Sequence, residues 1–252
     1  MIAIYLSGTG NTKHCLELLL QTLNEPSVMI PMDNELSGDV ILEHNMVILA
    51  YPTQFSNIPF MVRDFIERNA SVWRGKKVFC LATMGLFSGD ATGCAARLLK
   101  KYGADIIGGL QVRMPDSVCD HKALKKSRED NLKIIQAAEL KIKKAALKMN
   151  AGTFLREGLS FFAHMAGLFG QRLWFYSKTK QYSDKLKISD ACIGCGLCAK
   201  VCPMKNIIMK NKKAYAQGKC TMCYGCISLC PRKAITLLGN QVVEQYRYDK
   251  MS

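Results

Sequence analysis

Cysteine is the residue whose spacing best suits chemistry in this chain, because eight of the twelve cysteines fall between Cys192 and Cys230. They form two runs with the same pattern, Cys-x2-Cys-x2-Cys-x3-Cys-Pro, offset by 28 residues at every cysteine. The first run is Cys192, Cys195, Cys198 and Cys202, and the second is Cys220, Cys223, Cys226 and Cys230. Thiolates are soft, anionic ligands that suit iron–sulfur clusters and zinc. The repeat therefore predicts metal chemistry.

Over residues 186–239 this pattern resembles the bacterial-type dicluster ferredoxins, and the resemblance implies two [4Fe-4S] clusters. In that family the fourth cysteine of each run binds the other cluster. The resemblance thus assigns one cluster to Cys192, Cys195, Cys198 and Cys230, and the other to Cys220, Cys223, Cys226 and Cys202. Two zinc sites are the alternative, although the duplicated Cys-Pro pattern suits a cubane better.

Short strands are expected around the cysteine runs. Leu186–Ile188 would pair with Ile235–Leu237, and Ile207–Met209 would pair with Ala214–Ala216. These pairs and the crossed ligation would hold together ~55 residues that have little hydrophobic core of their own.

A second chemical feature is a hydroxyl- and glycine-rich loop between an apolar strand at 2–6 and a helix at 12–23. It consists of Ser7, Gly8, Thr9, Gly10, Asn11 and Thr12. Helix N-termini bind phosphate through free N–H groups and the helix dipole. The loop lacks the Gly-Lys-Ser/Thr ending of a P-loop and the third glycine of a dinucleotide fingerprint. Its hydroxyl and amide groups predict binding of one terminal phosphate.

This loop resembles the FMN-phosphate loop of flavodoxins. The resemblance implies that FMN lies beyond the carboxyl ends of the strands and that two later loops flank its isoalloxazine ring. The expected flanking residues are Pro52, Thr53, Gln54, Phe55, Thr83, Met84, Gly85, Leu86 and Phe87. Unlike the corresponding loops of long flavodoxins, these loops are not acidic and contain no tryptophan.

The elements that position these loops alternate between strand and helix. Further strands are expected at 27–30, 46–50, 77–82 and 105–113, the last weakened by Gly108 and Gly109, and an amphipathic helix at 121–149. Such alternation predicts an α/β fold, a doubly wound parallel sheet, followed by a small α+β ferredoxin domain. The expected parts are residues 1–150 (flavodoxin-like), 151–185 (an aromatic helical connector), 186–239 (ferredoxin) and 240–252 (a tail).

The connector is rich in aromatic residues and has helical spacing of its apolar positions. We expect it to pack on one or both domains. The alternative is that residues 154–176 lie on a membrane surface as an interfacial helix.

The whole chain resembles a flavodoxin–ferredoxin fusion family of anaerobic bacteria and archaea, also in the step Met114-Pro115-Asp116 after the last strand. This resemblance implies an electron-transfer protein that relays single electrons between two [4Fe-4S] clusters and FMN. One alternative is a ferredoxin-type carrier whose flavodoxin-like domain is an empty docking module. Another is an FMN-dependent reductase of a small molecule. No catalytic residue is expected.

Composition and charge limit the class of protein. Apolar residues make up 49% and charged residues 22%, which excludes intrinsic disorder. The chain shows no export signal and no apolar run long enough to span a membrane, so we expect it in the cytoplasm. The net charge is +15, and the expected cofactors would reduce it to about +9. We expect redox proteins with acidic surfaces as donor and acceptor, and no nucleic acid, because no reader motif is present.

Overall fold

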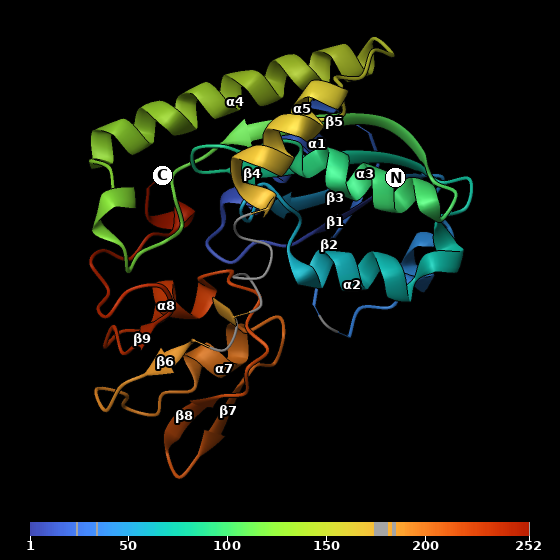
Figure 1. Ribbon diagram of the computed structural model, residues 1–252. Coiled ribbons are helices and arrows are strands. Elements are labelled where there is room, and N and C mark those ends of the chain that lie inside the picture. Colours follow the sequence, from blue (N-terminus) through green and yellow to red (C-terminus); the bar gives the residue numbers. More distant parts are fainter. Residues whose placement is uncertain (24, 34, 174–180, 183–184, 252) are drawn as a thin grey trace.

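A computed structural model describes residues 1–23, 25–33, 35–173, 181–182 and 185–251. Its centre is a five-stranded parallel sheet with the strand order β2-β1-β3-β4-β5 (Figure 1). The strands are β1 (Ile2–Tyr5), β2 (Val28–Pro31), β3 (Met46–Pro52), β4 (Lys77–Met84) and β5 (Asp105–Arg113). This is the strand order of flavodoxin-like folds, and it confirms the predicted doubly wound α/β architecture.

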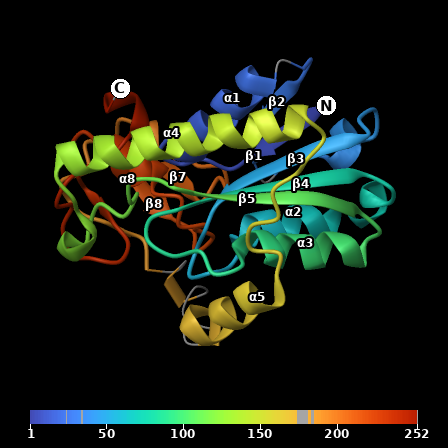
Figure 2. The same ribbon diagram turned by 90° about the horizontal axis from the view of Figure 1, so that it is seen from above.

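Helices cover both faces of the sheet (Figures 1 and 2). α1 (Asn11–Leu23) and α4 (Arg128–Asn150) pack on one face, and α2 (Phe60–Arg68) and α3 (Ala91–Lys101) pack on the other. The apolar strands are buried between the two helical layers. The sequence predicts that this last helix begins near residue 121. α4 begins later, at Arg128, because Ser127 caps it by accepting a hydrogen bond from the backbone N–H of Asp130.

Shorter turns complete the first part of the chain. They are the 3-10 helices η1 (Gly38–Ile41), η2 (Ala70–Trp73) and η3 (Lys122–Leu124).

The chain after α4 runs along the outer edge of β5. The backbone N–H of Gly109 donates to Leu155 over 2.7 Å, and the N–H of Glu157 donates back to Gly109 over 2.9 Å. A β carbon at Gly108 would lie 2.7 Å from the carbonyl oxygen of Leu155. β5 covers the predicted residues, with a register shift against β4 between Ile106 and Gly108, and its glycines allow the second backbone to approach.

α5 (Phe161–Gly167) and the π-helical turn η4 (Leu168–Arg172) follow and project beyond α3 (Figure 2). A fully buried carboxylate, Asp90, anchors them to the start of α3. Asp90 contacts Arg97 at 2.6 Å, His164 at 3.0 Å and Arg172. The segment 154–176, for which a membrane surface was the alternative location, includes residues 174–176, which lie outside the described residues. No helix in the described ranges is long and apolar enough to cross a membrane.

The cysteine-rich part contains two antiparallel strand pairs and two short helices. β6 (Lys187–Ile188) pairs with β9 (Ile235–Thr236), and β7 (Ile207–Lys210) pairs with β8 (Lys213–Ala216). Both pairs agree with the sequence prediction. The helices are α7 (Leu197–Val201) and α8 (Gly225–Leu229).

The tail after residue 240 returns to the first domain and ends in a 3-10 turn, η5 (Tyr248–Lys250). Figure 1 shows the C-terminus beside the first half of α4. The backbone N–H of Val243 donates to Cys119 over 2.8 Å, and that of Tyr248 donates to Thr9 over 2.9 Å. The tail thus connects the cysteine-rich part to the loop at the start of α1.

Candidate functional site

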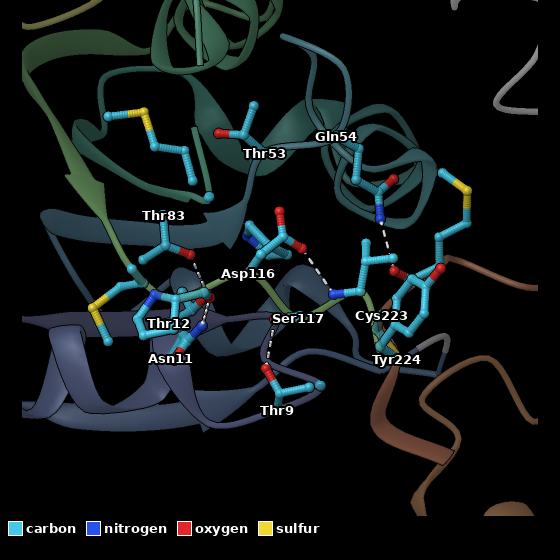
Figure 3. Close-up of a pocket in the computed structure, with 18 of the residues that line it drawn as sticks. Thr9, Asn11, Thr12, Thr53, Gln54, Thr83, Asp116, Ser117, Cys223 and Tyr224 are labelled. Atoms are coloured by element: carbon cyan, nitrogen blue, oxygen red, sulfur yellow. Dashed lines mark hydrogen bonds between the residues drawn. The ribbon is translucent and has the colours of Figure 1, made fainter. Parts of the chain in front are cut away.

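A cavity of about 260 Å³ opens at the carboxyl ends of β1, β3, β4 and β5 (Figure 3). The three predicted loops line it, together with the loop after β5 and part of the cysteine-rich domain. The predicted residues on its wall are Ser7, Gly8, Thr9, Asn11, Thr12, Pro52, Thr53, Gln54, Phe55, Thr83, Met84, Gly85, Leu86 and Phe87. Gly10 is not on the wall, because it faces Tyr248 of the tail.

Hydroxyl groups from different loops meet on this wall (Figure 3). The Oγ1 atoms of Thr12 and Thr83 are 2.8 Å apart, and Thr9 Oγ1 lies 2.7 Å from Ser117 Oγ. The Oγ1 atom of Thr53 is buried and has no hydrogen-bond partner among the described residues. A buried hydroxyl in that state costs about 1–3 kcal/mol. The wall therefore suits a polar ligand that would complete the hydrogen bonds.

Asn11 holds the first loop in place. Its Nδ2 donates to the carbonyl of Pro115 over 2.8 Å, and its Oδ1 accepts from the Tyr246 hydroxyl over 2.6 Å. The side chain is thus already engaged inside the protein. α1 begins at this residue, so its first backbone N–H groups have no acceptor within the helix and can meet an anion.

The cysteine-rich domain closes one side of the cavity. Gly8 and Gly225 are in backbone contact: a β carbon at Gly225 would lie 3.0 Å from the Gly8 carbonyl oxygen, and one at Gly8 would overlap the carbonyl of Cys223. Gln54 Nε2 also donates to the carbonyl of Thr221 over 2.6 Å. The loop at residues 7–12, which we call the phosphate-type loop, and the second cysteine run therefore touch directly.

The eight cysteines of the two runs gather in two crossed sets. A small cavity is lined by Cys192, Cys195, Cys198 and Cys230, so the last cysteine of the second run joins the first three of the first run. Burial raises the pKa of Cys220, Cys223 and Cys226, and the neighbouring thiol of Cys202 adds to the rise in all three. The same residues are thus brought together as in the predicted ligand sets.

The two cysteine runs also fold alike. The backbone N–H of Asn206 donates to the sulfur of Cys202, and that of Ala234 donates to the sulfur of Cys230, both over 3.3 Å.

Within the described ranges, no three histidine, cysteine or carboxylate side chains are arranged to hold a single metal ion. Metal analysis is therefore the test between iron and zinc.

Asp120 fixes the junction between the domains. Its buried carboxylate accepts hydrogen bonds from the Tyr224 hydroxyl at 3.0 Å and from the backbone N–H groups of Leu237 and Leu238 at 2.6 and 2.9 Å. Burial and this carboxylate raise the pKa of Tyr224, which stays a neutral donor. Tyr224 lines the cavity, so the contact positions one of its walls.

Sequence reasoning missed part of the wall. The stretch after β5 supplies Met114, Pro115, Asp116, Ser117 and Val118. Its position at the carboxyl end of a parallel strand was an available signal, because such ends meet at one sheet edge. Beside Cys223, the wall also includes Leu124, Met222, Tyr224 and Leu238. The last three carried no signal, because nothing local predicts how the two domains dock.

Comparisons with known proteins found matches to each of the two parts. Residues 185–231 match the family described as a 4Fe-4S dicluster domain. The fold is similar to Megasphaera elsdenii flavodoxin, with 20% identity over 59% of this chain and 99% of that one, and a TM-score of 0.43. It is also similar to an FMN-bound Fusobacterium nucleatum flavodoxin, with 12% identity over 60% and 97% of the two chains, and a TM-score of 0.43.

No curated protein matches the chain by sequence. The strand order and the dicluster match nevertheless give its organisation: the chain joins a flavodoxin-like fold to a 4Fe-4S dicluster domain, as in a flavodoxin–ferredoxin fusion with a role in electron transfer.

Proposed function

We propose that this protein relays single electrons between two [4Fe-4S] clusters and an FMN held in the cavity at the sheet edge. The observation that carries the proposal is the contact between Gly8 and Cys223, because it joins a phosphate-type loop to a cysteine of the second run. When bound, the clusters supply one-electron steps, and the flavin can take up one electron or two.

The FMN proposal rests on the chemistry of the wall. The backbone N–H groups of Asn11 and Thr12, with the hydroxyls of Thr9 and Thr12, would hold the phosphate, and Ser7 Oγ, which accepts from the N–H of Lys13 over 3.2 Å, would lie beside it. The loops that contain Thr53 and Phe87 would flank the ring, and the unpartnered Thr53 hydroxyl would gain a partner there. Asn11 acts by fixing the loop.

The ligand sets proposed for the clusters follow the crossed gathering of cysteines. Cys192, Cys195, Cys198 and Cys230 would hold an outer cluster, and Cys220, Cys223, Cys226 and Cys202 would hold an inner cluster. Outer and inner are defined relative to the cavity at the carboxyl ends of β1, β3, β4 and β5, which we call the flavodoxin-like cavity. Cys223 lines this cavity, and no cysteine of the first set does.

The outer set offers a docking surface for a redox partner. Cys195 is exposed, and its neighbours Ile193 and Leu197 are 60% and 42% exposed. Asp190 is the only acidic residue in the sequence from 185 to 238, which contains Lys185, Lys187, Lys200, Lys205, Lys210, Lys212, Lys213, Lys219, Arg232 and Lys233. Exposed apolar side chains on a domain with this excess of basic residues fit a partner with an acidic surface.

Anaerobic reconstitution tests the cofactors. We expect about eight irons and one FMN for each chain. Iron without FMN at any flavin concentration would support the empty docking module, and a zinc-filled chain would overturn the iron–sulfur assignment.

A cysteine variant tests the relay. Cys198→Ala should prevent FMN reduction by a ferredoxin-specific donor while direct photoreduction of the flavin continues. Cys94→Ala is the matched control, because Cys94 is a half-buried cysteine outside both sets. If Cys198→Ala left reduction by the donor unchanged, the order of the relay would be wrong.

A further inference from the structure

A second cavity, of about 200 Å³, lies between the start of α4 and the C-terminal tail. Asp116 and Leu124 line both this cavity and the flavodoxin-like one, so the two are neighbours. Figure 1 shows the tail and the start of α4 side by side at this place. Nothing in the proposed relay uses this cavity.

The wall of this second cavity is strongly basic. Its cationic side chains are Lys125, Lys126, Arg128, Arg247 and Lys250, against the carboxylates of Asp116 and Glu244. Of these five cations, only Arg247 forms an ion pair with a described residue, Asp249, at 2.8 Å. Burial lowers the pKa of Lys125 although Glu244 and Asp116 are near. Five cationic side chains thus face three carboxylates, those of Asp116, Glu244 and Asp249, which leaves an excess of positive charge at the cavity.

The wall is formed by segments whose backbones are fixed. Gln245 Nε2 donates to the carbonyls of Ile227 and Cys230 over 2.9 and 2.7 Å. The Tyr246 hydroxyl reaches Asn11 in the phosphate-type loop, and Ser127 caps α4 beside the basic residues. The cations are therefore presented by an ordered frame and not by a free terminus, which lowers the entropy cost of binding an anion.

We propose that this cavity binds the carboxylate or phosphate group of a small anionic molecule whose remainder extends past Asp116 and Leu124 to the flavodoxin-like cavity. Unpaired basic side chains on a concave wall raise the local concentration of anions and bind them through charge-assisted hydrogen bonds. Its use as a substrate position would rest on the proposed flavin function, whereas its affinity for anions does not.

The test is titration calorimetry on the full, cofactor-loaded chain with two probes, succinate and 2′,5′-adenosine diphosphate. Binding of succinate alone would indicate a carboxylate site, and binding of the diphosphate alone a phosphate site. The double variant Lys125→Gln/Arg128→Gln should weaken binding at least tenfold. The control Lys143→Gln/Lys144→Gln removes the same charge from exposed positions of the same helix that do not line the cavity, and should change binding less than twofold.

A third variant should strengthen binding and so guards against misfolding as the cause of a loss. Glu244→Gln removes one of the two opposing carboxylates, and we expect at least twofold tighter binding. The proposal is overturned if neither probe binds, if the control loses as much affinity as the double variant, or if the probes bind only by displacing FMN from the loop at residues 7–12. None of these outcomes depends on whether electrons reach the flavin.

Discussion

Replacing Gly8 with alanine tests the contact between the two domains most directly. The φ of Gly8 is not in the left-handed region, so the loop itself can accept a side chain. An added β carbon would lie 2.6 Å from the carbonyl carbon of Cys223 and 2.9 Å from its β carbon. Carbon atoms pack at about 3.5–4.0 Å, so the two backbones must separate by about 1 Å. Overpacking of this kind costs about 1–3 kcal/mol.

Two further glycines give a graded series. Gly225→Ala brings a β carbon to 3.0 Å from the Gly8 carbonyl oxygen, and Gly170→Ala brings one only to 3.5 Å from the Phe87 ring. The loss of thermal stability should therefore be largest for Gly8→Ala, smaller for Gly225→Ala and negligible for Gly170→Ala. For a chain of this size each kcal/mol lowers Tm by about 2–4 °C. Circular dichroism measures Tm, and stopped-flow absorbance measures flavin reduction through the clusters, which should slow in the same order.

The reasoning is refuted by one combination of results. If Gly8→Ala melts within about 1 °C of the natural protein and its flavin is reduced through the clusters at the natural rate, the loop does not touch Cys223 in solution. A variant with a lower Tm but an unchanged rate of flavin reduction through the clusters would show that the contact contributes to stability and not to electron transfer.

Three other changes should have effects set by single contacts. Tyr246→Phe leaves Asn11 Oδ1 without its donor and should lower the urea-unfolding free energy by about 1–2 kcal/mol, with faster release of FMN. Asp90→Ala leaves the largely buried Arg172 without its carboxylate, so it should cost about 3 kcal/mol and expose η4 to trypsin. Burial raises the pKa of Asp116, so its ionisation opposes folding as pH rises. The Tm of Asp116→Asn relative to the natural chain should therefore increase from about pH 4 to pH 7, whereas a constant difference would contradict this.

The sequence predicts the elements whose signal is local. Helices cover both faces of β3 and β4, so these strands are apolar at nearly every position. Their continuous apolar runs therefore predict them from the sequence alone. The sheet order predicts that the loops at 7–12 and 83–87 meet at one edge, as they do. What the glycines of β5 accommodate, the passage of Leu155 along the strand, could not be predicted locally, because Leu155 lies some 45 residues away in the chain.

The junction was beyond local prediction. Asp120 lies in a loop with no periodicity, and its three donors come from residues more than 100 positions later. The tail carried no motif, yet Tyr246 reaches Asn11 across 235 residues. Such contacts depend on how the two folded domains dock, and no periodicity or residue spacing in a single sequence indicates the docking geometry.

The two cysteine runs differ where the second one meets the first domain. Gly194 and Gly196 of the first run have left-handed φ values of 70° and 76°. At the equivalent positions of the second run, Met222 and Tyr224 adopt φ of 54° and 59°, at a cost of roughly 1–2 kcal/mol each. Both of these side chains line the flavodoxin-like cavity.

At the next position the two runs differ in the opposite sense, because the side chain is in the first run and the glycine is in the second. The first run has Leu197 there, which is exposed, and the second run has Gly225, which is pressed against Gly8. The second run thus has side chains in a strained conformation where they close the cavity, at Met222 and Tyr224. It has a glycine where its backbone touches the first domain, at Gly225. Because strain of this kind persists where the surrounding structure requires it, we infer that the second run is shaped to face the flavodoxin-like domain, whereas Leu197 and Cys195 of the first run stay exposed.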